Sequence, residues 1–225
     1  MIENKSVTAI ILVAGNSSRY GKNRNKNFER INGKTILSYS LNEFNKNENI
    51  DDIIVAVKPN EISIVQEILQ EENLNKNIKI INGGKDRKES VYNCIKSTNS
   101  DIVIIHDGAR PLIKQEYINK CVGNMEQFDG VTIGVKSKDT IKITNKDNVV
   151  IETTKRCSTW VIQTPQCFNR KTLIEAHEEC KDEEITDDCV LLENCKHKVK
   201  VIEGEYTNIK ITTYEDLNIV KQFLN

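Results

Sequence analysis

A run of basic residues follows the first apolar segment of the chain, in the stretch ILVAGNSSRYGKNRNK from Ile11 to Lys26. Its cations are Arg19, Lys22, Arg24 and Lys26, and the stretch contains no acidic residue to balance them. The whole chain is nearly neutral, since 32 Lys and Arg stand against 33 Asp and Glu, for a formal net charge of -1. The local excess of positive charge therefore indicates a loop suited to binding a small polyanion.

Two familiar phosphate-binding motifs do not fit this loop. A dinucleotide fingerprint needs three glycines in G-x-G-x-x-G spacing, but the stretch has only Gly15 and Gly21. A Walker A loop needs four residues between its glycines and a Ser or Thr after the lysine, whereas Asn23 follows Lys22 here and the glycines enclose five residues. Taken alone, the stretch is also open to interpretation as a solvated basic surface loop.

Short apolar runs alternate along the chain with segments of helical periodicity. The runs rich in Ile and Val lie at 8–13, 52–57, 78–81, 101–106 and 130–135. Such continuous runs are typical of strands covered on both faces, as in a parallel sheet. Helical spacing of apolar residues occurs at 36–44, 62–70 and 90–97. The alternation predicts an α/β fold with a Rossmann-like, doubly wound, mostly parallel sheet, and such sheets bind ligands at the carboxyl ends of their strands.

Residues 139–154 depart from this rhythm and predict a protruding β-hairpin. Ile141 and Ile143 alternate with polar residues, NKDN supplies a turn, and Val149 and Ile151 alternate again. An isolated hairpin is marginally stable in water, so we expect it to pack against another surface, such as a second subunit.

The end of the chain has the signals of a helix start. Thr213 and Asp216 have the spacing of a capping box, and Leu217, Val220, Phe223 and Leu224 are expected on one apolar face. No repeat, low-complexity tract or Pro-rich linker divides the chain. We therefore expect a single domain over residues 1–225, including a β-arm at about 136–156.

The composition disfavours several classes of protein. The cysteines number seven and form no C-x-x-C pair, which favours reduced thiols in a cytoplasmic protein over a disulfide framework or a zinc site. The near-neutral charge disfavours a nucleic-acid binder. The sequence shows neither a signal-peptide pattern nor an 18-residue apolar span, so we expect no membrane association.

Nine short motifs together resemble one enzyme family. In chain order they are A-G-x-x-x-R at 14–19, a lysine at Lys26 before Phe28, GG at 83–84, R-x-x-S-V at 87–91, HDGARP at 106–111, DTIK at 139–142, QTPQ at 163–166, TDD at 186–188 and NIKIT at 208–212. Each motif is weak by itself. In this order, and over essentially the whole chain, they resemble the 2-C-methyl-D-erythritol 4-phosphate cytidylyltransferases of the non-mevalonate isoprenoid pathway.

A few positions depart from the usual sequence of that family. Val13 replaces the first alanine of an A-A-G start, Ser17 replaces a second loop glycine, and Gly108 replaces an alanine of H-D-A-A-R-P. Asn25 stands where the family usually has a proline, so we expect a less rigid approach to Lys26.

The resemblance implies transfer of a cytidylyl group from CTP to a polyol phosphate, 2-C-methyl-D-erythritol 4-phosphate, with release of pyrophosphate. The acceptor phosphate would attack the α-phosphorus in line, so catalysis would depend on positioning and on stabilisation of negative charge. The catalytic residues implied are Arg19, Lys26, Arg156 and Lys210. Nucleotide contacts are implied for Ala14, Gly15, Gly83, Gly84, Ser90 and Asp107. Acceptor contacts are implied for Arg110, Thr140, Arg156, Thr164, Thr186, Asp187 and Lys210.

The resemblance also gives physical roles to the nucleotide side. Gly83 and Gly84 would let the flat base approach the backbone, and Ser90 would hydrogen-bond the edge of the cytosine. Mg2+ or another divalent cation is implied as cofactor, with Asp107 as its protein contact, directly or through water. Arg110 would anchor either Asp107 or the acceptor phosphate.

The acceptor side is expected to involve two subunits. The arm of the family reaches the other subunit of a homodimer, so Thr140 and Arg156 would serve the site of the neighbour.

Two alternatives remain open from the sequence. A related enzyme that makes CDP-ribitol from ribitol 5-phosphate shares most of these motifs, although Trp160 before QTPQ favours the methylerythritol enzyme. The alternative of another class is a catalytically silent nucleotide-binding module.

Overall fold

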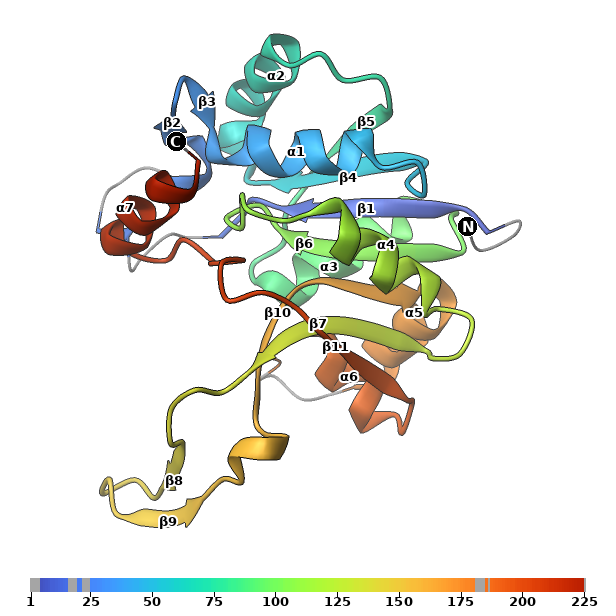
Figure 1. Ribbon diagram of the computed structural model, residues 1–225. Helices are drawn as coiled ribbons and strands as arrows, with labels where there is room; N and C mark the ends of the chain where they lie inside the picture. The colour runs from blue at the N-terminus through green and yellow to red at the C-terminus, as the bar shows by residue number, and fades with distance from the viewer. Residues whose placement is uncertain (1–4, 16–19, 22–24, 181–184, 186, 225) are drawn as a thin grey trace.

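A central sheet organises the chain in the computed structural model, which describes residues 5–15, 20–21, 25–180, 185 and 187–224 (Figure 1). The strands described in this sheet run in the order β11-β7-β10-β6-β1-β4-β5. They are β1 Val7–Leu12, β4 Asp52–Val57, β5 Asn77–Asn82, β6 Ile102–Asp107, β7 Gly130–Lys136, β10 Trp160–Asn169 and β11 Val199–Glu203. The α/β sheet predicted from the apolar runs is confirmed.

The sheet is parallel except at one described strand. β10 pairs antiparallel with both β6 and β7, whereas β1 pairs parallel with β4 and β6, β4 with β5, and β7 with β11. The chain begins at β1 in the middle, proceeds to β4 and β5 on one side, and then returns to β6 on the other side. This reversal at β1 and β6 leaves a crevice at the carboxyl ends of the two strands, which is where open α/β sheets bind ligands.

Helices cover both faces of the sheet, and this explains the continuous apolar runs. Within β1, Ala9 and Ile11 pack in one buried cluster and Ile10 packs in another, because successive side chains of a strand point to opposite faces. The first cluster includes residues of α1 Ile36–Lys46, α2 Ile62–Glu71 and α4 Gln115–Gly123. The second includes residues of α3 Arg87–Lys96, α5 Arg170–Glu179 and α6 Asp188–Asn194.

The last helix, α7 Tyr214–Phe223, begins with the predicted capping box between Thr213 and Asp216. Leu217 and Val220 are buried, but Phe223 is 53 % exposed, so its predicted place on the apolar face is wrong. At 3.6 residues per turn, Phe223 lies about 120° around the helix from Leu217, whereas Leu224 returns to the packed side. This packing joins α7 to the segment that precedes it through Ile211.

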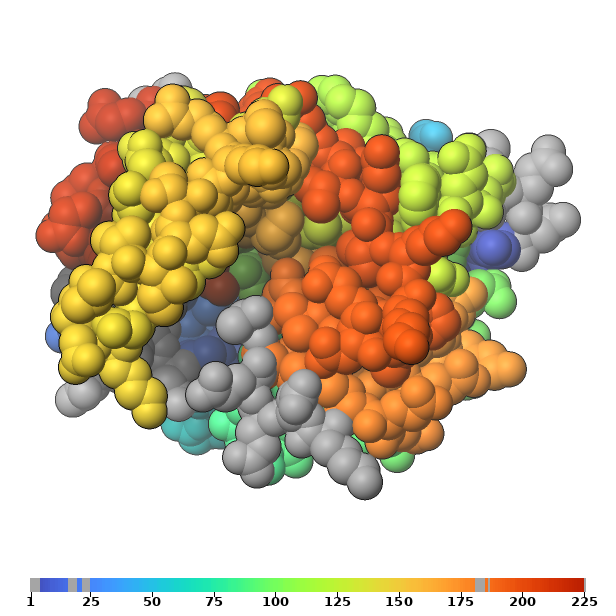
Figure 2. Space-filling view, turned by 90° about the horizontal axis from the view of Figure 1, so that it is seen from below, coloured from blue at the N-terminus to red at the C-terminus, as the bar shows by residue number. Residues whose placement is uncertain are grey.

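The predicted hairpin forms a separate two-stranded sheet of β8 Lys142–Thr144 and β9 Val150–Thr153. It projects from the body between β7 and β10 in Figure 1, and Figure 2 shows it as a yellow band beside a hollow. Its apolar side chains face outward: Ile143 is 46 % exposed, Val149 60 % and Ile151 67 %. Within this chain, therefore, the arm buries little of its own apolar surface.

Short elements complete the described fold. They are the 3-10 helices η2 Lys26–Phe28, η3 Pro59–Glu61 and η4 Arg156–Ser158, and a small hairpin of β2 Arg30–Ile31 and β3 Lys34–Thr35. Among the helices of the described residues, none is both long and apolar enough to span a membrane.

Candidate active site

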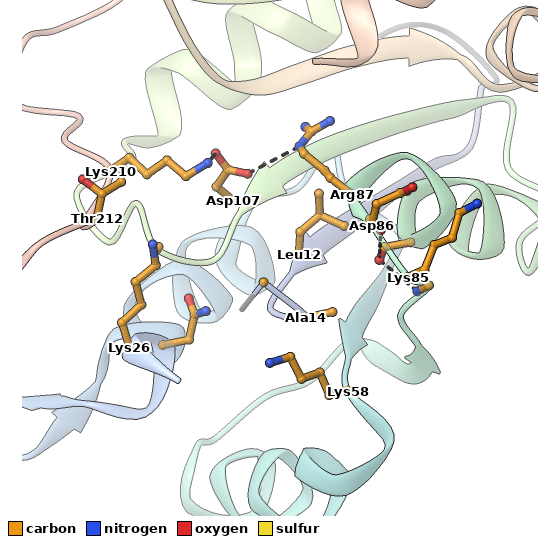
Figure 3. Close-up of a pocket in the computed structure, with 15 residues that line it drawn as sticks. Leu12, Ala14, Lys26, Lys58, Lys85, Asp86, Arg87, Asp107, Lys210 and Thr212 are labelled. Atoms are coloured by element: carbon orange, nitrogen blue, oxygen red, sulfur yellow. Dashed lines mark hydrogen bonds and ion pairs between the residues drawn. The ribbon is translucent and has the colours of Figure 1, made fainter. Parts of the chain in front are cut away.

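A pocket of about 590 Å3 lies at the carboxyl ends of β1 and β6, where the strand order reverses (Figure 3). Its wall combines segments that are far apart in the sequence, from the loop after β1 to the segment before α7. The sequence-predicted site residues that line it are Ala14, Gly15, Lys26, Gly84, Ser90, Asp107 and Lys210. Arg19 and Thr186, also predicted, lie outside the described residues, as do Ser17, Lys22 and Arg24.

Lys26 follows a buried asparagine, Asn25, whose side chain is fixed by hydrogen bonds. The side chain of Asn25 is the N-cap of η2, and the residue is only 5 % exposed. Its Nδ2 donates to the carbonyl of Val13 at 2.8 Å and to Glu61 Oε2 at 2.9 Å, and its Oδ1 accepts from the amide of Asn27 at 3.1 Å. The expected looser approach to Lys26 is therefore wrong in the described part of the loop, because hydrogen bonds supply the restraint.

The two glycines before α3 are required by the packing of the protein itself. A Cβ atom on Gly83 would lie 2.4 Å from the Cβ of Ala14, and one on Gly84 would lie 2.4 Å from the side chain of Glu89. Gly84 lines the pocket, but Gly83 lies behind it, with its amide bonded to the carbonyl of Val57 at 2.8 Å. The packing of the protein by itself therefore excludes a side chain at both positions, and close approach of a base to this backbone stays a prediction.

Ser90 braces this loop from the first turn of α3. Its hydroxyl donates to the carbonyl of Asp86 at 2.7 Å and accepts from the amide of Gly84 at 2.9 Å. Because a serine hydroxyl has a single proton, Ser90 can contact a ligand only as an acceptor in this arrangement. The N-cap of α3 is Asp86, whose side chain accepts from the amide of Glu89.

Asp107 is the anion at the centre of the charged wall. Its Oδ2 lies 2.8 Å from Lys210 Nζ and 3.6 Å from Arg110 Nε, and its Oδ1 lies 3.9 Å from Arg87 Nε. Burial alone would raise the pKa of this carboxyl, but the three cations outweigh it and hold the pKa well below its ordinary value. Asp107 is therefore ionised at neutral pH.

Three buried groups fix Asp107 from behind. Thr164 Oγ1 accepts from the amide of Asp107 at 3.0 Å and lies 3.2 Å from His106 Nδ1. His106 Nε2 lies 3.1 Å from the carbonyl of Arg110, and a carbonyl only accepts, so this nitrogen carries the proton. Burial lowers the pKa of His106 to about 4, which keeps the ring neutral. Thr164 and Arg110, predicted as acceptor contacts, are 4 % and 9 % exposed and do not line the pocket.

The remaining acceptor residues lie apart from this pocket. Thr140 and Arg156 sit at the base of the arm, where Arg156 Nη2 donates to Thr140 Oγ1 at 3.2 Å, and both residues are exposed. Asp187 caps α6 by accepting from the amide of Val190, and its Oδ2 accepts from Gln166 Nε2 at 3.0 Å. The pocket of a single chain thus lacks the residues predicted to come from the arm.

Several pocket residues were not assigned from the sequence. They are Leu12, Asn27, Lys58, Lys85, Asp86, Arg87, Ala109 and Thr212. Arg87 had a signal, since it opens the R-x-x-S-V motif, but the motif alone does not say what the guanidinium contacts. Lys58 follows the end of β4, a position that in this fold faces the ligand crevice.

The pocket suits a metal ion only if phosphate oxygens of a substrate supply most of its ligands. The described residues contain no group of three or more His, Cys, Asp or Glu side chains that could hold an ion by themselves. Of the pocket carboxylates, Asp86 is used as a helix cap, which leaves Asp107 as the group suited to a cation. Magnesium commonly takes one or two carboxylates and completes its shell with phosphate oxygens and water, and one carboxylate beside a cationic wall agrees with that pattern.

Comparison with known proteins points to a single family. The family model for IspD, 2-C-methyl-D-erythritol 4-phosphate cytidylyltransferase, matches residues 7–225. The enzyme of that name from Caldanaerobacter subterraneus subsp. tengcongensis is 43 % identical over 224 residues, which cover 97 % of this chain and 99 % of the relative. The one from Clostridium tetani is 44 % identical over 219 residues, covering 96 % of this chain and 89 % of the relative.

A solved structure agrees with the sequence comparison. The crystal structure of 4-diphosphocytidyl-2C-methyl-D-erythritol synthase from Anaerococcus prevotii matches with a TM-score of 0.89 at 32 % identity, covering 99 % of this chain and 97 % of that one. The two alternatives left open by the sequence, a ribitol phosphate enzyme and a catalytically silent module, are not supported by these comparisons.

Proposed function

The chain belongs to the 2-C-methyl-D-erythritol 4-phosphate cytidylyltransferase family, and from that membership we propose how its residues carry out the reaction. The protein transfers a cytidylyl group from CTP to 2-C-methyl-D-erythritol 4-phosphate in non-mevalonate isoprenoid synthesis, giving CDP-methylerythritol and pyrophosphate. The observation that carries the residue assignment is the convergence of Lys26, Asp107 and Lys210 on one pocket from three distant segments.

The cations of the pocket stabilise charge on the transferring phosphorus. An oxygen of the acceptor phosphate attacks the α-phosphorus in line while the bond to the departing pyrophosphate breaks, and negative charge collects on the equatorial oxygens. Lys26, Lys210 and Arg19 neutralise this charge. Lys26 and Lys210 already line the pocket before substrates bind, so little reorganisation is needed when the charge develops. The bracing of Asn25 next to Lys26 supports this preorganisation.

The nucleotide lies along the loops after β1 and β5. Ala14, Gly15 and Gly84 present backbone to it, with Gly83 supporting them from behind the pocket, and Ser90 has one lone pair left after its bonds to Asp86 and Gly84. That lone pair accepts from the exocyclic amino group of cytosine. Uracil carries a carbonyl oxygen at the same place, so this contact favours CTP over UTP.

The acceptor is positioned from two chains. Lys210 holds its phosphate from within the pocket, and Thr186 and Asp187 lie on the segment that leads into α6. Thr140 and Arg156 enter from the arm of a partner subunit, because their exposed, mutually bonded side chains do not line the pocket of their own chain. Arg110 and Thr164 contribute by fixing Asp107 from behind.

A divalent cation such as Mg2+ at Asp107 supplies additional neutralisation of the phosphates when it is bound. The chain's contribution is a carboxylate kept ionised by its neighbours.

We also propose a homodimer joined through the arm, which the exposed apolar side chains of β8 and β9 support. A cytoplasmic location is proposed as well, and the reduced cysteines support it.

A pyrophosphate-release assay tests the function. CTP, UTP and ATP are each incubated with 2-C-methyl-D-erythritol 4-phosphate or with ribitol 5-phosphate, and the nucleotide product is identified by mass spectrometry. Rapid release only with CTP and the methylerythritol acceptor is expected. Release only with ribitol 5-phosphate, or binding of CTP without turnover, would contradict the proposal.

A further inference from the structure

Asp107 and Lys210 are partners in this structure, yet both are assigned to ligands in the proposed function. Lys210 Nζ lies 2.8 Å from Asp107 Oδ2, and Figure 3 shows the pair at the wall of the pocket. When Lys210 turns to a substrate phosphate, Asp107 loses the closest of its side-chain cations among the described residues and depends on Arg110, on Arg87 and on any divalent cation bound there. A buried carboxylate left without a counter-ion is costly, so the pair resists opening unless another cation stays close.

Arg87 is placed to be that cation. Its Nε lies 3.9 Å from Asp107 Oδ1, the oxygen that faces away from the Lys210 contact (Figure 3). Its Nη1 lies 2.7 Å from Asp188 Oδ2, and Asp188 is fully buried at the first residue of α6. Neither carboxylate oxygen of Asp188 makes a hydrogen bond of good geometry, so the ion pair with Arg87 is the main interaction that compensates the buried charge of Asp188.

The two cations differ in how firmly they are held. The Lys210 side chain is 36 % exposed, and it forms an ion pair with Asp107. The Arg87 side chain is 27 % exposed and is tied at its far end to a carboxylate that cannot reach water. The Asp188 contact is also shorter than the Asp107 contact, so Arg87 stays with Asp188 while Lys210 is free to change partner.

We infer that Arg87, held in place by Asp188, is a positioning residue that keeps Asp107 neutralised so that Lys210 can leave it for the substrate phosphate. The inference rests on the proposed function. Arg110 stays beside the oxygen that Lys210 vacates, with its Nε 3.6 Å from Asp107 Oδ2 and its Nη1 bonded to the carbonyl of Asn208 at 2.7 Å, and Arg87 is the cation beside the other oxygen. Through Arg87 the α3 side of the pocket, which holds the nucleotide, is linked to α6 on the acceptor side.

The test uses the double variant Arg87→Gln/Asp188→Asn, because Arg87→Gln alone would leave a buried, unpaired carboxylate and disturb folding. The double substitution leaves the net charge of the protein unchanged, and the two new amide side chains can hydrogen-bond to each other. Without Arg87, Lys210 holds Asp107 more tightly. We expect the KM for the acceptor to rise about tenfold, with less than about a twofold change in the KM for CTP. A thermal melt verifies that the variant is folded.

A double-mutant cycle with Lys210→Ala isolates the mechanism. If Arg87 acts by releasing Lys210, the Arg87→Gln/Asp188→Asn change has no further effect on the acceptor KM once Lys210 is absent. An equal rise in both backgrounds, an equal rise in the KM for CTP, or unchanged kinetics of the folded double variant would each overturn the inference.

A matched control is the exposed pair of Arg30 and Glu71, whose side chains are each 50 % exposed. The change Arg30→Gln/Glu71→Gln should leave every kinetic constant as in the wild type. Turnover by the wild type distinguishes failure of the proposed function from failure of the inference about Arg87. An active wild type with an unaffected double variant overturns only this inference, whereas a wild type without turnover overturns the proposed function and the inference with it.

Discussion

Lys210 Nζ lies 2.8 Å from Asp107 Oδ2, so two residues on segments far apart in the sequence are paired across the wall of the pocket. The contact joins the end of β6 to the segment that precedes α7. It also sets the charge state of the site, because Lys210 is the strongest of the three cations that counter the burial of Asp107. Binding of a phosphate ligand therefore replaces ion pairs within the protein, such as that of Lys210 with Asp107, by ion pairs with the ligand.

Removal of Lys26 should impair catalysis without unfolding the protein. Lys26→Ala deletes a preorganised cation from the pocket wall, and loss of one such group typically lowers kcat by about 10²–10³. The side chain is partly exposed, so the melting temperature should stay close to that of the wild type. Lys114→Ala, which removes a cation paired with Glu205 outside the pocket, is the control and should retain full activity. A Lys26→Ala enzyme of wild-type rate would contradict the role.

The bracing asparagine should matter for both stability and rate. Asn25→Ala removes the donors to Val13 and Glu61 and leaves a buried carbonyl unsatisfied, which costs about 1–3 kcal/mol of unfolding free energy. Since Lys26 is the next residue, kcat should also fall, by about tenfold. Urea denaturation and steady-state kinetics measure the two effects. Asn49→Ala, which loses an exposed bond to Asn119, should change neither.

Acid should destabilise the protein through His106. Its pKa is lowered to about 4 by burial, below the ordinary value of about 6.5, so the unfolded chain takes up the proton first as pH falls. The stability from the neutral ring is complete above pH 6.5 and is lost between about pH 6.5 and 4, an effect on the order of 3 kcal/mol.

Comparison with a non-titrating variant isolates this contribution. His106→Gln should show a shallower loss of unfolding free energy between pH 7 and pH 5 than the wild type, by urea denaturation at each pH. The comparison is needed because burial also lowers the pKa of His177 to about 4, and that residue acts in the same direction. Equal pH slopes for the two proteins would show that His106 does not behave as described.

The arm should control the oligomeric state. Ile151 is 67 % exposed within the chain, and burial of its side chain in a dimer would make Ile151→Asp strongly destabilising to the dimer. Sedimentation equilibrium should then show a monomer. Activity should fall as well, because Arg156 and Thr140 would no longer reach a neighbouring site. Ile219→Asp, on the exposed side of α7, is the control. A wild-type chain that is itself monomeric and active would contradict the dimer.

The sheet was largely predictable, but two of its described strands, β10 and β11, were not predicted. The strands β1, β4, β5, β6 and β7 could be predicted from their apolar runs, because the sheet is covered by buried clusters on both faces. β10 was not predicted, since WVIQTPQCFN contains a proline and two glutamines and does not resemble a central strand. The structure accommodates Pro165 where the register shifts between Ile162 and Gln166, and Gln166 bonds to Asp187.

The site was predictable where a motif places one residue at one strand end. Asp107 is the last residue of β6 and Lys26 lies beyond the end of β1, and topology alone brings them to the same edge. The pairing of Arg87 with Asp188 was not predictable, because both belong to motifs full of charged residues and nothing in their spacing shows which partners meet. The bracing by Asn25 was also missed, since a departure from proline indicates lost rigidity until its hydrogen bonds are known.

The role of the two lysines is best tested by a crystal structure of this protein with CTP, which shows where their ammonium groups lie. We expect Lys26 Nζ and Lys210 Nζ both to lie within hydrogen-bonding distance of the triphosphate or of an acceptor phosphate bound beside it. The contact of Lys210 with Asp107 should be longer than 2.8 Å. If CTP occupies the pocket while both ammonium groups point away from every phosphate, the account is contradicted.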